Sequence, residues 1–255
     1  MREVIELDID EITPEPSEVL EAQGMVGRAL PARIIKLLNS ALEIFRQLAE
    51  PRGILQEWPR SQFEAVYDGN GLNSSEGPVP LIVPKSDALA IFAATMGDSL
   101  ITKSSELFAQ GGAALGFLLD AVNSSGAERM GKAMCRSFIS LLPEDLRNSR
   151  KLIGQYYCPG HCGWHISGQE RLFELLRPQE IGVSLNDKWV MQPFKSISGF
   201  LVAGGPAIHR FKPAFGFCKE CKEHKCVQRL KILEKEARSK KLEARISWAR
   251  FHSGF

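Results

Sequence analysis

The sequence of 255 residues has no apolar run of membrane-spanning length, so we expect no transmembrane helix and no membrane partner. Its first twenty residues are strongly acidic and lack the apolar core of a secretory signal. We therefore expect a cytoplasmic protein. Cysteines stay reduced in that compartment, where a cluster of them usually binds metal or carries redox chemistry instead of forming disulfides.

Several common functional motifs are also missing from the chain. It contains no GxGxxG, no P-loop, no HExxH and no GxSxG, so dinucleotide, nucleoside-triphosphate, zincin and serine-hydrolase chemistry have no support. The glycine-rich stretch GGAALG at 111–116 lies in a helical region, where small residues indicate close helix packing.

The net charge of the chain is small, but the charged residues are unevenly distributed along it. The net charge is +2, with 32 basic and 30 acidic side chains. From Lys219 to Arg250 there are 11 basic and 5 acidic residues, a local charge of +6, so the rest carries −4, the difference between +2 and +6. Acidic residues interrupt this tail and it has few aromatics, which favours a solvated helix over a nucleic-acid-binding segment.

The pattern of apolar residues predicts both strands and helices. Early strands are expected at 2–9 and 87–97. Helices are expected at 17–24, 31–49, 99–112 and 113–142, the last broken near 124–126, and at 170–178. Turn residues between Trp58 and Val83 predict short strands joined by turns. The segments 180–193 and 194–205 are expected to form an antiparallel pair of strands.

Five of the six cysteines lie in the last hundred residues. The clearest pattern is Cys218-x2-Cys221-x4-Cys226, a spacing at which thiolates converge on one metal. A fourth ligand is available from CPGHCGWH, which holds Cys158, Cys162, His161 and His165. Zinc and an iron–sulfur cluster fit this donor set equally well, so both stay open. Cys135 lies on an apolar helical face and is expected to be a core side chain.

The same segment contains the Pro159-Gly160 turn, flanked by Tyr156, Tyr157, His161 and Trp164. Proline fixes φ and glycine permits positive φ, so such a turn can present backbone amides and aromatic faces to a ligand. A Pro-Gly pair by itself is far more often only a turn.

Residues 156–203 resemble the activation domain of vitamin B12-dependent methionine synthase, most closely its short stand-alone bacterial forms. The matching positions are Pro159, Gly160, Trp164, Gln169, Leu172, Phe173, Ile181, Gly182, Leu185, Met191, Pro193, Lys195, Ser196, Ser198 and Gly199. Stand-alone members often carry cysteines where Cys162, Cys218, Cys221 and Cys226 stand. The resemblance is looser upstream, and extends over about 1–229.

The resemblance implies an α+β fold, a twisted and mainly antiparallel sheet with packed helices, to which the tail would add a charged C-terminal helix. We expect a domain over 1–226, with a Cys-rich metal segment at 158–226, and a basic helical tail over 227–255. In this family the domain binds S-adenosylmethionine and docks over the corrinoid, so that an electron and a methyl group restore methylcobalamin.

The resemblance assigns the ligand to the Pro159-Gly160 turn, with Tyr156, His161 and Lys195 as further cofactor-binding candidates. Tyr156 replaces the family's arginine and His161 replaces its tyrosine, while the Thr-Glu-Ser triplet is Asn186-Asp187-Lys188. Lys188 is a second candidate to substitute for the arginine. The metal candidates are Cys162, Cys218, Cys221, Cys226 and Cys158.

Three hypotheses follow from these residues. The first is an accessory protein for corrinoid-dependent methyl transfer that docks on a corrinoid protein or B12-dependent methyltransferase, with an iron–sulfur or zinc site and an electron donor as a further partner. The second is a metal-stabilised binding module on the same fold that has lost S-adenosylmethionine binding. The third is a redox sensor whose clustered thiols oxidise to disulfides.

Overall fold

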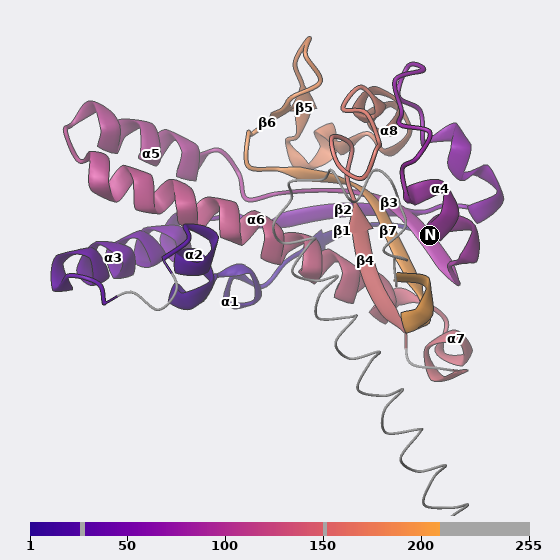
Figure 1. Cartoon of the computed structure of the whole chain (residues 1–255), viewed down its shortest axis with the longest axis horizontal. Helices are drawn as coiled ribbons and strands as arrows, with labels where there is room; N and C mark the ends of the chain where they lie inside the picture. The colour runs from indigo at the N-terminus through magenta and orange to yellow at the C-terminus, as the bar shows by residue number, and fades with distance from the viewer. Residues whose placement is uncertain (26–28, 150–151, 210–255) are drawn as a thin grey trace, which may run out of the picture.

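The computed structural model describes residues 1–25, 29–149 and 152–209 (Figure 1). The predicted C-terminal helix and the predicted domain boundary at 226 lie outside these residues. No helix among these residues is long and apolar enough to cross a membrane.

The centre of the fold is a five-stranded sheet in the order β1-β2-β3-β7-β4, in which every neighbouring pair is antiparallel. Its strands are β1 (Arg2–Glu6), β2 (Arg52–Glu57), β3 (Ala88–Thr95), β4 (Ile153–Tyr157) and β7 (Ile197–Gly204). A separate hairpin pairs β5 (Ser184–Leu185) with β6 (Met191–Gln192). The antiparallel sheet confirms the α+β expectation.

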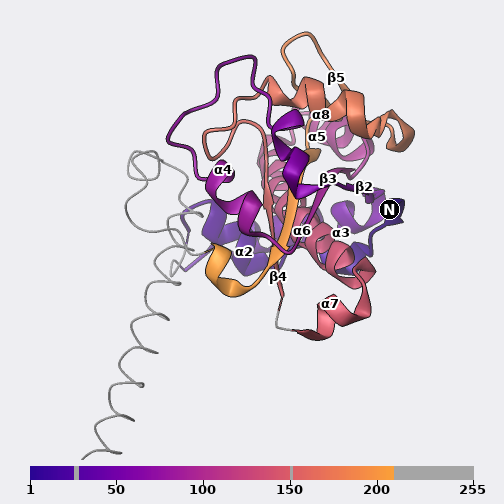
Figure 2. The ribbon, with the colours of Figure 1, turned by 90° about the vertical axis from the view of Figure 1, so that its right-hand side faces the viewer.

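Helices pack on both faces of this sheet. Their bounds are α1 (Ile9–Ile12), α2 (Pro16–Ala22), α3 (Ala32–Leu48), α4 (Val79–Ile82), α5 (Ser99–Ala109), α6 (Ala113–Leu141), α7 (Glu144–Ser149) and α8 (Gly168–Leu176). In Figure 1, α3, α5 and α6 extend together to one side of the sheet. The β5–β6 hairpin and α7 lie at opposite ends of the molecule in both views (Figures 1 and 2).

The alternation of side chains along each central strand divides the core in two. On β3, Ala90 and Phe92 face α6, whereas Leu89 and Ile91 face the side covered by α8. Successive strand residues point to opposite faces, so a strand that is buried throughout supplies both halves of the core. Gly53 on β2 makes room for Met134 of α6, because a Cβ there would lie 2.2 Å from the Met134 sulfur.

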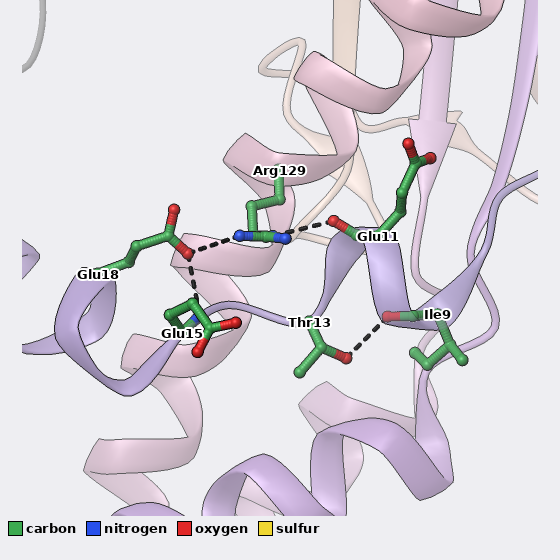
Figure 3. A network of polar contacts seen from close by, with 6 residues as sticks. All are labelled: Ile9, Glu11, Thr13, Glu15, Glu18 and Arg129. Atoms are coloured by element: carbon green, nitrogen blue, oxygen red, sulfur yellow. Dashed lines mark hydrogen bonds and ion pairs between the residues drawn. The ribbon is translucent and has the colours of Figure 1, made fainter.

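The N-terminal helices are fastened to α6 by one polar network (Figure 3). A capping box opens α2: the Glu15 N–H donates to the Glu18 carboxylate at 2.9 Å. Arg129 of α6 reaches the same carboxylate at 2.9 Å and donates to the Glu11 carbonyl at 2.9 Å. The guanidinium therefore joins α1, α2 and α6.

Most predicted helices are confirmed, but three expectations are wrong. The segment after Trp58 forms 3-10 turns and α4 instead of short strands, since its prolines remove backbone donors. Helix α6 is continuous through 124–126. The segments 180–193 and 194–205 do not pair with each other: the first folds back on itself as β5–β6, and β7 pairs with β3 and β4.

Candidate functional site

The Pro159-Gly160 turn follows β4 directly and consists of two consecutive tight turns. In the first, the His161 N–H donates to the Cys158 carbonyl at 3.1 Å, and Gly160 has φ +87°. In the second, the Trp164 N–H donates to the His161 carbonyl at 3.0 Å, with Cys162 at φ +53°. The Gly160 N–H also donates to the Trp164 carbonyl at 2.7 Å. These bonds consume the backbone amides of Gly160 and His161.

Two of the four aromatic residues that flank the turn are core residues. Trp164 is 1% exposed and its ring stacks on Phe200 of β7, with centroids 4.7 Å apart. Tyr157 is 3% exposed and belongs to the same half of the core. The faces of these two rings are therefore not available to a ligand, and the rings instead fix the turn to the sheet.

A second loop, residues 67–77, lies against the turn. The Ser74 N–H donates to the Gly163 carbonyl at 2.8 Å, and the Trp164 indole N–H donates to the Asp68 carbonyl at 2.9 Å. Asn73 accepts from the His165 N–H at 2.8 Å. Gly77 approaches so closely that a Cβ would lie 2.7 Å from the Cys162 carbonyl oxygen. The two loops hold each other in one shape.

Tyr67 on this loop has a buried hydroxyl for which no hydrogen-bond partner is found among the described residues. Its ring packs against Trp164, with centroids 5.4 Å apart. Burial, and after it the nearby Cys162, raises the pKa of Tyr67 to about 12, so the hydroxyl keeps its proton at neutral pH.

The two described cysteines of the candidate metal set lie at the turn but in different surroundings. Cys158 accepts a hydrogen bond at its thiol from the Ser198 N–H, and burial together with the nearby Cys162 raises its pKa to about 12. A thiol kept protonated in this way is a poor metal ligand unless a cation displaces the proton. Cys162 packs beside the half of the core that faces α8.

The remaining metal candidates, Cys218, Cys221 and Cys226, lie outside the described residues. Within 1–25, 29–149 and 152–209, no three His, Cys, Asp or Glu side chains come together as a metal site would need. The prediction of a metal site at Cys162 and the C-terminal cysteines thus stays a prediction. Cys135 is buried on α6, as expected, and its pKa is raised to about 12, chiefly by burial.

Tyr156 lies on the opposite face of the sheet from Trp164. Its ring packs against α6, where a Cβ on Gly131 would lie 2.6 Å from it, and meets Phe92 edge-on with centroids 6.3 Å apart. The position that carries an arginine in the resembling family is therefore occupied here by a ring held between α6 and the sheet.

Lys195 belongs to the connection between β6 and β7. Its ammonium group lies 3.0 Å from an Asp120 carboxylate oxygen and donates to the Ser124 hydroxyl at 2.8 Å, both on α6. Its side chain is 19% exposed. These contacts commit the charge of Lys195 to α6, and Lys188 at the tip of the β5–β6 hairpin is exposed.

Two histidines lie at the turn. His161 is exposed at the turn itself, while His165 meets Trp189 of the β5–β6 hairpin edge-on, with centroids 6.2 Å apart. Trp189 also donates its indole N–H to Glu170 of α8 at 3.2 Å. Together these contacts dock the hairpin beside the turn.

Gln169 and Ser198, which the resemblance matched in the sequence without a role, form a buried polar pair. The Ser198 hydroxyl of β7 donates to the side-chain carbonyl of Gln169 on α8 at 3.0 Å, and the two residues are 1% and 3% exposed. Ser196 and Thr95 form a second buried hydroxyl pair at 2.9 Å. A usable signal was present, because Gln169 shares a helical face with the core residues Leu172, Phe173 and Leu176.

Comparison with known proteins agrees with this geometry. The structure is similar to a solved structure described as "Crystal Structure of the MetH Reactivation Domain bound to AdoHcy", with a TM-score of 0.56 and 14% identity over 79% of this chain and 78% of that chain. At that identity the likeness shows the fold. No curated protein sequence matches the chain. A family model described as "Vitamin B12 dependent methionine synthase, activation domain" matches residues 81–229, more than half of the 255 residues. The chain therefore belongs to the activation-domain family of vitamin B12-dependent methionine synthases.

Proposed function

We propose that this protein is an accessory protein that reactivates the corrinoid of a B12-dependent methyltransferase on which it docks. An electron reduces inactive cob(II)alamin to cob(I)alamin, whose cobalt then takes the methyl group from the sulfonium of S-adenosylmethionine. The products are methylcobalamin and S-adenosylhomocysteine. The corrinoid stays with the partner, and this chain holds the methyl donor.

The observation that carries the proposal is the rigid double turn at Pro159-Gly160 in a chain of this family. The backbone amides of Gly160, His161 and Trp164 are bonded within the turn, the Trp164 ring is stacked on Phe200 of the sheet, and His161 is exposed. A site built this way is preorganised, so a ligand that binds it loses little free energy to ordering the protein.

The described ligand of the similar solved structure supports S-adenosylmethionine as the methyl donor. That structure is of a reactivation domain with AdoHcy, which is what S-adenosylmethionine becomes once its methyl group has left. We place the ligand beside Pro159, Gly160 and His161. The Lys195 ammonium group is paired with Asp120. It therefore supports the neighbouring loop and is not the main group that binds the carboxylate of the ligand.

We further propose a metal–thiolate site formed by Cys162 with Cys218, Cys221 and Cys226, with Cys158 as a fifth candidate. Cys162 and Gly163 both have positive φ, so the backbone reverses direction at the proposed ligand. An iron–sulfur cluster here would supply the reducing electron, whereas zinc would tie the C-terminal segment to the turn and leave the electron to a separate donor.

Two measurements on anaerobically purified full-length protein test these proposals. Calorimetric titration with S-adenosylmethionine is expected to show one site, and no heat at millimolar ligand would overturn the ligand proposal. Iron, sulfide and zinc analysis with a visible spectrum tests the metal. A broad absorption band near the violet, together with iron and sulfide, supports electron transfer. One zinc ion per protein without visible absorption supports a zinc site that ties the C-terminal segment to the turn.

A second candidate function is favoured by one observation. The ring of Tyr156 fills the space over Gly131, so the chain has no guanidinium at this position to pair with a ligand carboxylate. Such a protein would be a metal-stabilised docking module that binds the corrinoid protein without S-adenosylmethionine. It is distinguished by intact binding to the corrinoid protein when calorimetry detects no S-adenosylmethionine.

A further inference from the structure

We infer that Gln169 is a positioning residue that sets the shape of the Pro159-Gly160 turn through Ser198. The inference rests on the proposed function in one respect, since it takes this turn to be the ligand site. It goes further by naming the contact on which the geometry of that site depends.

The side-chain amide of Gln169 is buried in an apolar layer. Gln169 is 3% exposed on a helical face that otherwise carries Leu172, Phe173 and Leu176. Burying an amide is unfavourable unless it is hydrogen-bonded. The side-chain bond found for Gln169 among the described residues goes to the Ser198 hydroxyl, at 3.0 Å. The hydrogen bond with Ser198 therefore compensates for burying the Gln169 amide.

Ser198 lies next to the start of the turn. Its backbone N–H donates to the Cys158 thiol at the start of the turn. The next residue, Gly199, lies so close to β4 that a Cβ would be 2.0 Å from the Tyr157 carbonyl oxygen and 3.0 Å from the Cys158 Cα. Any rotation of β7 at Ser198 therefore moves the first residues of the turn.

The other end of the turn leads into α8 after the three residues 165–167. A Cβ on Gly168 would lie 2.1 Å from the Trp164 indole nitrogen, so the first turn of α8 is in contact with the last residue of the double turn. Gln169 follows immediately. Its bond to Ser198 closes a ring that runs from β7 to the turn, along the turn to α8, and back to β7. A shift of α8 relative to β7 is therefore transmitted to the turn, because the turn is the covalent segment that joins them.

The variants that test this are Gln169→Met, Ser198→Ala, their double variant and Gln169→Glu. The matched control is Leu172→Met, a volume-conserving change at a fully buried position of the same helix. Each full-length variant is titrated with S-adenosylmethionine, its melting temperature is measured, and the amide signal of Gly160 is followed by NMR in the unliganded protein.

We expect Gln169→Met and Ser198→Ala each to weaken S-adenosylmethionine binding about tenfold and to shift the Gly160 amide signal. The double variant is expected to be no weaker than either single variant, because both remove the same contact. Gln169→Glu keeps an acceptor for Ser198, so we expect its affinity to stay within about threefold of the original although its melting temperature falls. Leu172→Met is expected to change neither the affinity for S-adenosylmethionine nor the melting temperature.

A Gln169→Met variant that binds as tightly as the original, or single effects that add in the double variant, would overturn the inference. A purely structural role predicts lower melting temperatures for Met and Glu alike with unchanged affinity, and that result also overturns it. If the original protein binds no S-adenosylmethionine, the proposed function fails. The Gly160 signal then decides alone, and an unchanged signal in both single variants refutes the positioning role.

Discussion

Gly199 of β7 packs directly on the backbone of Tyr157, the last residue of β4. A Cβ at position 199 would lie 2.0 Å from the Tyr157 carbonyl oxygen, and Gly199 has φ +153°. Both facts require glycine, because L side chains rarely adopt that backbone conformation and no side chain fits between the two strands. The close approach brings β4 and β7 together where the Pro159-Gly160 turn begins.

Gly199→Ala is therefore expected to cost about 3 kcal/mol or more of unfolding free energy, because the clash involves backbone that cannot move aside. Denaturant unfolding measures it. The control is Gly182→Ala, where φ is +77° but no atom lies within 4 Å, so only strain of about 1 kcal/mol is expected. Equal costs for the two variants would show that the contact with Tyr157 is unimportant.

Gly131→Ala tests the packing of Tyr156 against α6. Alanine normally stabilises a helix by about 1 kcal/mol over glycine, but here its Cβ would lie 2.6 Å from the Tyr156 ring, so we expect net destabilisation of roughly 1–3 kcal/mol. Adding Tyr156→Val removes the ring and is expected to recover part of the loss.

The helix offers its own control in Gly116→Ala. A Cβ there would lie 3.2 Å from the ring of Phe108, which is 50% exposed and free to move, so a neutral or favourable effect is expected. Thermal unfolding of the three variants measures the comparison. Additive effects of Gly131→Ala and Tyr156→Val would mean that the two residues do not share one space.

Glu18→Gln tests the ion pair of Figure 3 through its pH dependence. Burial alone would raise the pKa of Glu18, but bonds from the Glu15 N–H and Arg129 and the charges of Arg129 and Lys132 bring it below its ordinary value. A lowered pKa in the folded state adds stability above the unfolded pKa of about 4.3, and this stability is lost as the pH falls through the folded value.

Because both side chains are partly exposed, we expect Glu18→Gln to lower the unfolding free energy at pH 7 by less than about 1 kcal/mol. The difference should shrink toward zero as the medium is acidified below that pH range. Urea titrations at several pH values measure it, with the exposed Glu21→Gln of the same helix as the reference. A deficit that stays constant with pH would contradict the ion-pair explanation.

Removal of metal ligands tests the proposed thiolate site. We expect Cys162→Ser and Cys221→Ser each to release metal from the purified protein, because a four-ligand site that loses a thiolate binds far more weakly. Cys135→Ala is the control, since that thiol is buried on α6 in the half of the core opposite to the one beside which Cys162 packs. Metal content by elemental analysis decides, and unchanged stoichiometry in Cys162→Ser would exclude that residue from the ligand set.

Helical segments were largely predictable because their signals are local. The periodic apolar residues of α3 and α6 and the proline after α8 lie within a few turns of the structure they specify. The strand pairing was not predictable in the same way. The β5–β6 hairpin depends on the turn around Asn186, whose side chain accepts from the N–H groups of Lys188 and Val190, both at 2.9 Å. An alternation of apolar residues does not predict such a turn.

The candidate site was likewise predictable only in part. Pro159, Gly160 and the family likeness around them are properties of the amino-acid sequence, and they led to the family to which the chain belongs. Trp164, by contrast, was recognisable in the sequence only as an aromatic residue near the turn, and in the structure it is a core residue stacked on Phe200. The pair Gln169 and Ser198, separated by 29 positions, was invisible as a contact.

Which residues form the turn and where most helices lie follow from local residue preferences, because φ preferences and helical periodicity act within a few residues. The direction in which each side chain faces depends on long-range packing. Tyr156 and Tyr157 are neighbours, yet one packs on α6 and the other in the half of the core that faces α8. Strand register sets that direction, and register depends on partners far along the chain.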